Sequence, residues 1–224
     1  MSKIGILIFA RINSKRFPGK VLKNIIFNKN LLEIIFLRLK KFSNLQIVIC
    51  TSFSKNDDKI VRFCKSRKMK YFRGSLRNVF ARTVNCLKKY KFDAFVRVNA
   101  DRPFVDFDEV KKMIKIFKKK KIDIVTNQLS KNCPKGLACE VAHSKIFLDL
   151  QKNILKNSDK EHIFNFFYRN KRKYKIYNLI NKLYKKNYAR NLSLDRPNDL
   201  KKIQEIFSNF NNIYVPTKKV LKQK

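Results

Sequence analysis

The chain has 224 residues, of which 54 are Lys or Arg and 16 are Asp or Glu, so its formal net charge at pH 7 is +38. Hydrophobic residues make up 44% and aromatic residues 12%, which is typical of a folded globular protein and argues against a disordered chain. No apolar run approaches the ~20 residues of a membrane span, and five scattered cysteines suggest no disulfide framework, so we expect a cytoplasmic protein.

Strand-like and helix-like patterns alternate over the first 127 residues. The predicted strands are 3–10, 46–51, 69–73, 93–99 and 122–127. The helices predicted between them lie near 31–42, 56–68, 76–90 and 107–120. This alternation predicts an α/β fold with parallel strand pairing and helices on both faces of the sheet. A continuous apolar run such as "IGILIF" suits a strand that is buried on both sides.

After residue 127 the pattern changes. A Cys-Pro-Lys-Gly turn precedes a strand near 137–142, helices near 144–156 and 159–170, strands near 175–180 and 188–195, and a last helix after Pro197. We predict a single α/β domain over residues 1–215, with an excursion at about 128–185 and a basic C-terminal tail at 216–224.

The lysines admit two interpretations. A net charge of +38 is typical of a protein that binds nucleic acid or an anionic membrane surface. In "EVKKMIKIFKKKKIDIV", however, Val110, Met113, Ile114 and Phe117 form one apolar helix face and lysines fill the others. This distribution favours a solvated basic surface, which would still attract anionic ligands.

The first predicted strand runs into a strongly basic turn, "FARINSKRFPGKVL" at 9–22. In open α/β sheets ligands bind beyond the carboxyl ends of the strands, so this loop is the expected site. Cations combined with free backbone N–H groups suit a polyphosphate. The polar side chains that the loop offers are Arg11, Ser14, Lys15, Arg16 and Lys20. The glycine spacing of a Walker A loop is absent.

The same stretch resembles the A-R-x-x-S-x-R-x-P-G-K-x-L signature of the sugar cytidylyltransferases. This family includes the acylneuraminate and 3-deoxy-manno-octulosonate cytidylyltransferases and, most like this chain, the spore-coat polysaccharide biosynthesis (SpsF-like) branch. The likeness continues in order through "FRGSLRNVFART" (72–83), "VRVNADRPFVD" (96–106), "PKGLACEV" (134–141), "KEHIFNFF" (160–167) and "LSLDRPNDLKKIQEIF" (192–207). The resemblance implies a Rossmann-like nucleotide-diphospho-sugar transferase fold with a mostly parallel central sheet and helices on both faces.

The resemblance also implies an activity: Mg²⁺-dependent transfer of CMP from CTP to an acidic or other surface-polysaccharide sugar, with release of pyrophosphate. The residues that would bind CTP are Ala10, Arg11, Ser14, Arg16 and Lys20. The candidates for contacts to its nucleoside are Arg73, Ser75 and Asn99. Those that would be catalytic are Arg11, Lys20 and Asp101.

By the same resemblance, Asp101 and Asp195 would share the Mg²⁺, a cation that is usually held by one or two carboxylates and by phosphate oxygens. The sugar would be contacted by Glu140, Glu161 and His162. The excursion would form the sugar pocket or the contact of a homodimer. We expect no specific nucleic-acid partner.

Several of these residues admit a structural interpretation. Asp101 fits a turn at a strand end, and Asp195 fits a helix N-cap before Pro197. Glu161 and His162 could cap a helix, and the aromatic run "IFNFFYRNKRKYKIY" is more typical of a core and a dimer contact than of a base-stacking platform.

A zinc site is also conceivable, because three ligand-type residues are close in sequence, but C-x-x-C spacing is absent. These residues are Cys133, Cys139 and His143.

The chain also departs from the family pattern. Ala100 stands where a Gly usually precedes the metal aspartate, Ala138 replaces an acidic residue, and Arg77 and Asn78 replace an acidic pair. If residue 100 needed a positive φ, the added methyl group would displace Asp101. These departures leave open a catalytically inactive nucleotide-binding homologue. The net charge of +38 leaves open a second alternative, a basic nucleic-acid-binding protein.

Overall fold

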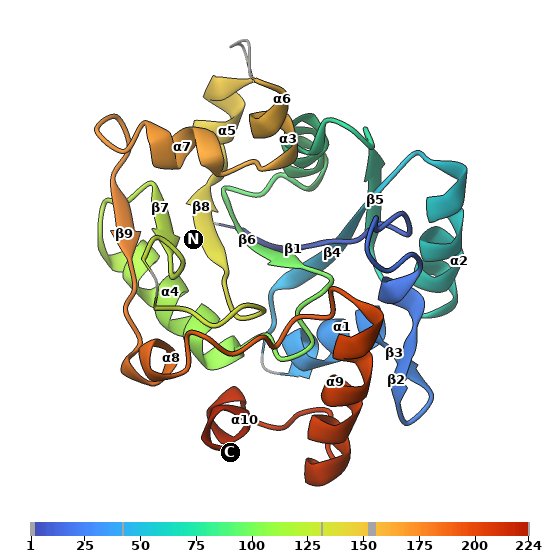
Figure 1. Cartoon of the computed structure of the whole chain (residues 1–224). Coiled ribbons are helices and arrows are strands. Elements are labelled where there is room, and N and C mark those ends of the chain that lie inside the picture. The colour runs from blue at the N-terminus through green and yellow to red at the C-terminus, as the bar shows by residue number, and fades with distance from the viewer. Residues whose placement is uncertain (1–2, 42, 131, 152–155, 224) are drawn as a thin grey trace.

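A central sheet of seven strands crosses the middle of the molecule (Figure 1). The count refers to residues 3–41, 43–130, 132–151 and 156–223, which the computed structural model describes. Every neighbouring pair is parallel except the two pairs of β8 (Glu140–His143), which runs antiparallel to β6 (Ala94–Asn99) and β7 (Ile124–Thr126). In spatial order the strands are β5 (Tyr71–Gly74), β4 (Gln46–Ser52), β1 (Ile4–Phe9), β6 (Ala94–Asn99), β8 (Glu140–His143), β7 (Ile124–Thr126) and β9 (Ile176–Asn178). The predicted mostly parallel α/β fold is confirmed.

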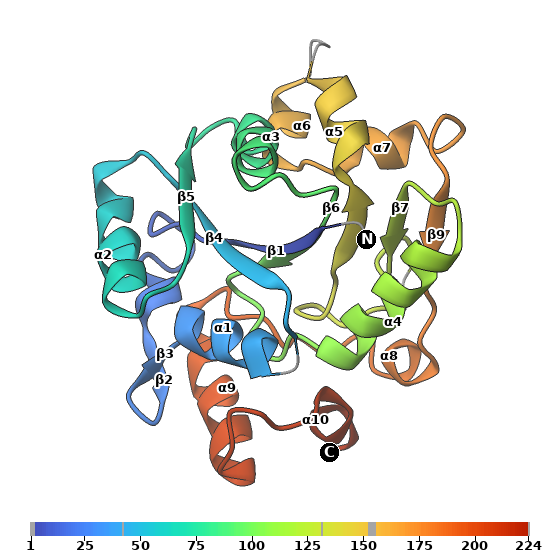
Figure 2. The same cartoon turned by 180° about the vertical axis from the view of Figure 1, so that it is seen from behind.

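Helices cover both faces of the sheet (Figure 2). The central strand β1 shows the cause, since Ile4, Ile6 and Ile8 belong to one hydrophobic core and Leu7 belongs to the other. The helices that contribute to the first core are α1 (Leu31–Lys41), α2 (Asp58–Ser66), α4 (Phe107–Lys119), α8 (Lys182–Lys186), α9 (Pro197–Phe210) and α10 (Thr217–Lys222). Those that contribute to the second are α3 (Val79–Tyr90), α5 (Ser144–Leu150) and α7 (Asn165–Arg169).

Short elements complete the chain. The turn η1 (Lys20–Leu22) leads into a hairpin of β2 (Asn24–Ile26) and β3 (Lys29–Asn30), and η2 (Lys55–Asp57) precedes α2. Helix α6 (Asn157–Glu161) packs beside α3. Within the described residues, no helix combines the length and apolar character that crossing a membrane requires.

The elements predicted up to residue 127 are all present, with bounds near those expected. The hairpin and α8 were not predicted, and the helix expected at 159–170 is divided into α6 and α7. Residue 42 and residues 152–155, on which the helices predicted at 31–42 and 144–156 also fall, lie outside the described residues.

The strand predicted at 188–195 is wrong. This segment makes one isolated parallel bridge, between Asn191 and Lys135, and does not join the sheet. The N–H groups of Ser193 and Asp195 donate to side-chain oxygens, and two others donate to distant backbone carbonyls. The N–H of Leu192 donates to the carbonyl of Lys135 at 2.8 Å, and that of Leu194 donates to the carbonyl of Asp101 at 2.9 Å. The second bond places Asp195 beside Asp101.

The basic C-terminal segment predicted as a tail forms α10. Its Val220 and Leu221 are buried, and Arg190 donates hydrogen bonds to the carbonyls of both. Two apolar residues among the lysines therefore suffice to pack the segment against the first core. The boundaries of the domain and of the excursion stay predictions.

Candidate active site

The basic loop after β1 is held in place by a buried carboxylate. Asp57, at the end of η2, accepts a hydrogen bond from the Ile12 N–H at 2.7 Å and others from the N–H and hydroxyl of Ser52. The Gly19 N–H closes the loop by donating to the Ile12 carbonyl at 2.9 Å. Asp57 belongs to no sequence motif that would indicate this role, and only the fold shows that it orders the loop.

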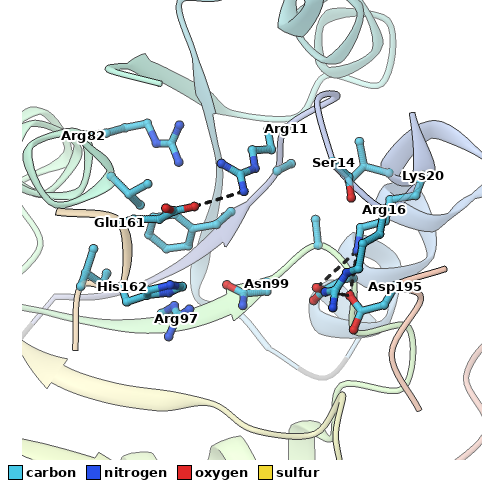
Figure 3. A pocket seen from close by; sticks show the side chains of 17 residues that line it. Arg11, Ser14, Arg16, Lys20, Arg82, Arg97, Asn99, Glu161, His162 and Asp195 are labelled. Atoms are coloured by element: carbon cyan, nitrogen blue, oxygen red, sulfur yellow. Dashed lines mark hydrogen bonds and ion pairs between the residues drawn. The ribbon is translucent and has the colours of Figure 1, made fainter. Parts of the chain in front are cut away.

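A pocket of about 300 Å³ opens between this loop and the carboxyl ends of β1 and β6 (Figure 3). Ten of the predicted site residues line it: Ala10, Arg11, Ser14, Arg16, Lys20, Asn99, Asp101, Glu161, His162 and Asp195. Seven further residues complete the wall: Phe9, Val21, Val79, Arg82, Arg97, Ala100 and Ile163.

Lys20 lies at the centre of one end of the pocket. Its Nζ is 2.6 Å from the carbonyl oxygen of Leu194, 3.2 Å from Oδ1 of Asp195 and 3.5 Å from Oδ2 of Asp101. The residue is only 7% exposed, so these contacts act in a medium of low polarity. The two aspartates therefore converge on one ammonium group, although they are far apart in sequence.

Asp195 forms ion pairs with two further cations, Arg16 and Lys135. Nη2 of Arg16 is 3.0 Å from its Oδ1, Lys135 pairs with its Oδ2, and the Ser193 hydroxyl donates to Oδ2 at 3.2 Å. Burial opposes ionisation of this carboxyl, but the hydrogen bond from Lys135 and the charge of Lys20 outweigh it and lower the pKa to about 2. Asp195 is therefore an anion at any physiological pH.

Asp195 does not cap α9. The cap position is Arg196, and the N–H groups of Asp195 and Arg196 both donate to Oδ2 of Asp199 at 2.8 Å. The carboxylate of Asp195 is thus directed to the pocket cations.

Arginines dominate the opposite end of the pocket. Arg11 pairs with Glu161 at 3.3 Å, and His162, Arg82 and Arg97 lie around this pair (Figure 3). Arg97 could have been found in the sequence, because it stands two residues before Asn99 on one strand and so shares its side of the sheet.

Residues 5–222 match the model of the family described as Cytidylyltransferase. The chain belongs to this family. It is 32% identical over 222 residues to an uncharacterized protein of Methanocaldococcus jannaschii, a match that covers 99% of this chain and 89% of that protein. Over 169 residues it is 30% identical to the spore coat polysaccharide biosynthesis protein SpsF of Bacillus subtilis, covering 73% of this chain and 69% of SpsF.

Among solved structures, a cytidylyltransferase from Leptospira borgpetersenii superposes with a TM-score of 0.91 at 26% identity, covering 99% of this chain and 92% of that one. The resemblance to the SpsF-like cytidylyltransferases is therefore confirmed, and the chain is a nucleotidyltransferase.

Three residues expected at the site of this cytidylyltransferase do not line the pocket. Arg73 joins β5 to the segment after β4, with Nε 2.9 Å from the Ser52 carbonyl oxygen and Nη2 2.7 Å from Oδ1 of Asp58. The Ser75 hydroxyl accepts the Asn78 N–H at 3.0 Å. Both side chains are thus engaged with neighbouring residues of the protein, and their contacts to the nucleoside stay predictions.

Glu140 is the third of these residues. It is fully buried on β8, and its Oε1 accepts hydrogen bonds from Arg97 at 2.9 Å and from Gln128 at 2.5 Å. β8 pairs Glu140 directly with Arg97 across the sheet. Glu140 therefore positions Arg97, which does line the pocket.

Ala100 is not among the residues with positive φ in the described chain, and its N–H donates to the Phe9 carbonyl at 2.9 Å, so alanine fits there without strain.

No group of three or more His, Cys, Asp and Glu residues in the described chain could hold a metal, which removes the zinc alternative. In the aromatic run, Phe164 and Phe167 are buried core residues.

Gly136 is expected to be essential for the shape of this site. Its φ is +98°, and a Cβ there would lie 2.5 Å from the backbone carbon of Leu192. We expect Gly136→Ala to lower the free energy of unfolding by more than about 2 kcal/mol, because left-handed strain adds to a backbone clash. Urea denaturation measures this change.

Gly19→Ala is the matched control, because Gly19 also has a positive φ, +74°, but a Cβ added there would have no neighbouring atom within 4 Å. It should cost only about 1 kcal/mol. Equal losses in the two variants would show that the approach of the Leu192 backbone to Gly136 is unimportant.

Proposed function

We propose that this cytidylyltransferase transfers CMP from CTP to a sugar, releases pyrophosphate, uses Mg²⁺ and acts in the cytoplasm. The observation that carries the proposal is the convergence of Arg16, Lys20 and two aspartates at one end of the pocket. The name of the relative SpsF supports a sugar of a surface polysaccharide as the acceptor.

The cations of the basic loop would bind the triphosphate. Lys20 is fixed by three oxygen contacts, whereas the side chain of Arg16 is 57% exposed and can turn toward a ligand. Ser14 adds a hydroxyl donor on the same wall. Charge-assisted hydrogen bonds from these groups would balance the charge that passes to the leaving pyrophosphate.

The residues present fit Mg²⁺. Both Asp101 and Asp195 line the pocket, and carboxylate oxygens are the ligands that this hard cation prefers. Asp101 is the more available of the two, because Arg102 approaches its Oδ1 only to 3.9 Å. When bound, Mg²⁺ would polarise the phosphate oxygens and neutralise their charge.

The reaction is an in-line displacement. An oxygen of the sugar forms a bond to the α-phosphorus of CTP while the bond from that phosphorus to the bridging oxygen breaks, and pyrophosphate leaves with the bonding electrons. Where the nucleophile is a hydroxyl, its proton must be accepted, and Glu161 offers a carboxylate at the sugar end of the pocket. Positioning and charge neutralisation supply the rate.

CTP with Mg²⁺ should raise the melting temperature more than ATP or GTP with Mg²⁺ does. A ligand stabilises the folded state in proportion to its affinity, so differential scanning fluorimetry at equal nucleotide concentrations reports the preference. Equal shifts with the three nucleotides would indicate a general polyanion site. Pyrophosphate release from CTP with a set of sugar acids and sugar phosphates then separates an active enzyme from an inactive homologue.

A further inference from the structure

Arg82 is a buried cation that lines the pocket without a carboxylate beside it. The residue is 3% exposed, and none of the ion pairs in the described part of the chain includes it. Its Nη1 makes one long contact, 3.4 Å to the Ser75 carbonyl oxygen. Its Nε has no hydrogen-bond partner among the described residues.

Such an arrangement is unfavourable for the empty protein. Transfer of a charge out of water costs several kcal/mol unless partners replace the water. The desolvation caused by burial accordingly lowers the pKa of Arg82. The compensation that the described residues supply is the Phe9 ring, whose centre is 5.9 Å from the guanidinium carbon, and the charge of Asp57, which forms no ion pair with Arg82. Neither replaces the lost hydrogen bonds, which indicates that the missing partner is a ligand.

A second buried arginine of the same chain shows the contrast. Arg38 is 4% exposed, but its Nη1 donates to the carbonyls of Ile213 at 2.6 Å and Val215 at 2.9 Å, and its Nη2 donates to that of Val105 at 3.3 Å. These bonds tie the C-terminal segment to the core. The Nε of Arg38 also has no partner among the described residues, so the contrast lies in the terminal nitrogens: those of Arg38 are held by three carbonyls, whereas Arg82 makes one long contact.

The fold is built to bring Arg82 to this place. A Cβ at Gly74 would lie 2.6 Å from Cγ of Arg82, so the glycine makes room for the side chain. Arg82 stands in the first turn of α3, whose cap is Asn78 and whose first turn holds no acidic residue. The positive end of the helix dipole therefore adds to the charge of the guanidinium.

The charges around Arg82 are otherwise matched. At this end of the pocket Arg11 pairs with Glu161 and Arg97 pairs with Glu140, so Arg82 supplies the excess positive charge. In Figure 3 it lies with Arg11 and Glu161, on the other side of Asn99 from Lys20 and Asp195. The pocket thus has two cationic ends.

We propose that Arg82 binds an anionic group of the acceptor, the phosphate of a sugar phosphate or the carboxylate of a sugar acid. The assignment rests on the proposed function, in which the triphosphate of CTP occupies the end around Lys20. A phosphate or carboxylate would supply the acceptor oxygens that the guanidinium lacks. Arg82 is then a recognition residue that selects charged over neutral sugars.

The test uses protein saturated with Mg²⁺ and the α,β-methylene analogue of CTP, so that the nucleotide end is filled and no transfer occurs. Inorganic phosphate and acetate are then titrated separately by isothermal calorimetry, in chloride buffer of constant ionic strength. We expect Arg82→Met to weaken binding of the preferred anion at least 10-fold, as for a lost hydrogen bond to a charged group. Its affinity for the nucleotide analogue should change less than 2-fold.

Two further variants control for folding and charge. Arg38→Met removes another buried arginine and should lower the melting temperature without changing anion affinity, whereas Arg82→Met should not lower the melting temperature. Arg82→Lys keeps the charge but loses the planar donor pair, and it should restore part of the affinity.

Other results of these titrations would contradict either the role of Arg82 or the proposed function. Unchanged anion binding in Arg82→Met overturns the inference, as does the absence of any anion binding to the nucleotide-loaded unaltered protein. Loss of the nucleotide analogue by Arg82→Met would place Arg82 in the CTP site instead. Failure of the unaltered protein to bind the analogue would contradict the proposed function itself.

Discussion

Asp101→Asn is expected to lower the rate of pyrophosphate release from CTP more than 100-fold and to leave the fold intact. The amide keeps the size of the side chain but removes the negative charge that Mg²⁺ requires. The Asp101 side chain is 27% exposed, and the cation nearest to it, Nζ of Lys20, is 3.5 Å from its Oδ2. The substitution should therefore lower the free energy of unfolding only slightly. The assay needs an acceptor sugar, and circular dichroism with thermal melting checks the fold.

Asp93→Asn is the control. Asp93 precedes β6 at its amino end and accepts the Lys3 N–H at 2.7 Å, so it lies at the other end of the strand that leads to Asp101. This variant should keep full activity.

If Asp101 and Asp195 hold one ion, Asp195→Asn should also be inactive. The activity of the double variant should then be little lower than that of the less active single variant. An active Asp101→Asn enzyme would contradict the proposed metal site.

Lys20→Met is expected to have the second large effect, on both substrate binding and stability. It removes the ammonium group that lies between Asp101 and Asp195 and leaves a buried carboxylate with one partner fewer. Breaking a buried ion pair on one side costs about 3 kcal/mol or more, although Arg16 and Lys135 still neutralise Asp195 in part. CTP affinity should fall at least 10-fold, since a cation for the triphosphate is also lost.

Lys23→Met separates this effect from a general change in net charge. Lys23 is exposed at the end of the same short helix, η1, and its substitution removes the same formal charge from the chain. This variant should change CTP affinity and the urea midpoint only slightly. Equal effects of Lys20→Met and Lys23→Met would show that CTP responds to the overall positive charge and not to a built site.

The first half of the chain was predictable because its signals are local. Continuous apolar strands alternate with amphipathic helices, and each pattern depends on residues within one element. The segment at 188–195 shows the limit. Its residues suit a strand, but its N–H groups bond to the Lys135 and Asp101 carbonyls, which are distant in sequence.

Predicted site residues divide in the same way. The basic loop was predicted from its place after a strand and Asp101 from the family resemblance, and both line the pocket because the carboxyl ends of β1 and β6 meet there. Glu140 and Arg73 belong to stretches that resemble the family, yet Glu140 is enclosed by the sheet and Arg73 bonds to the backbone after β4. Arg82 and Lys135 were not predicted, because lysines and arginines are common throughout this chain and only contact geometry distinguishes them.

By itself the sequence determined the α/β class and the family, and it predicted that the basic loop after the first strand binds the nucleotide, since these inferences depend on periodicity and on ordered motifs. Only the tertiary structure decided that Lys20 joins Asp101 to Asp195, that Glu140 neutralises Arg97, and that no carboxylate among the described residues pairs with Arg82. The physical reason is that the effect of a charge depends on burial and on partners within a few ångströms. Contacts between distant segments set both quantities.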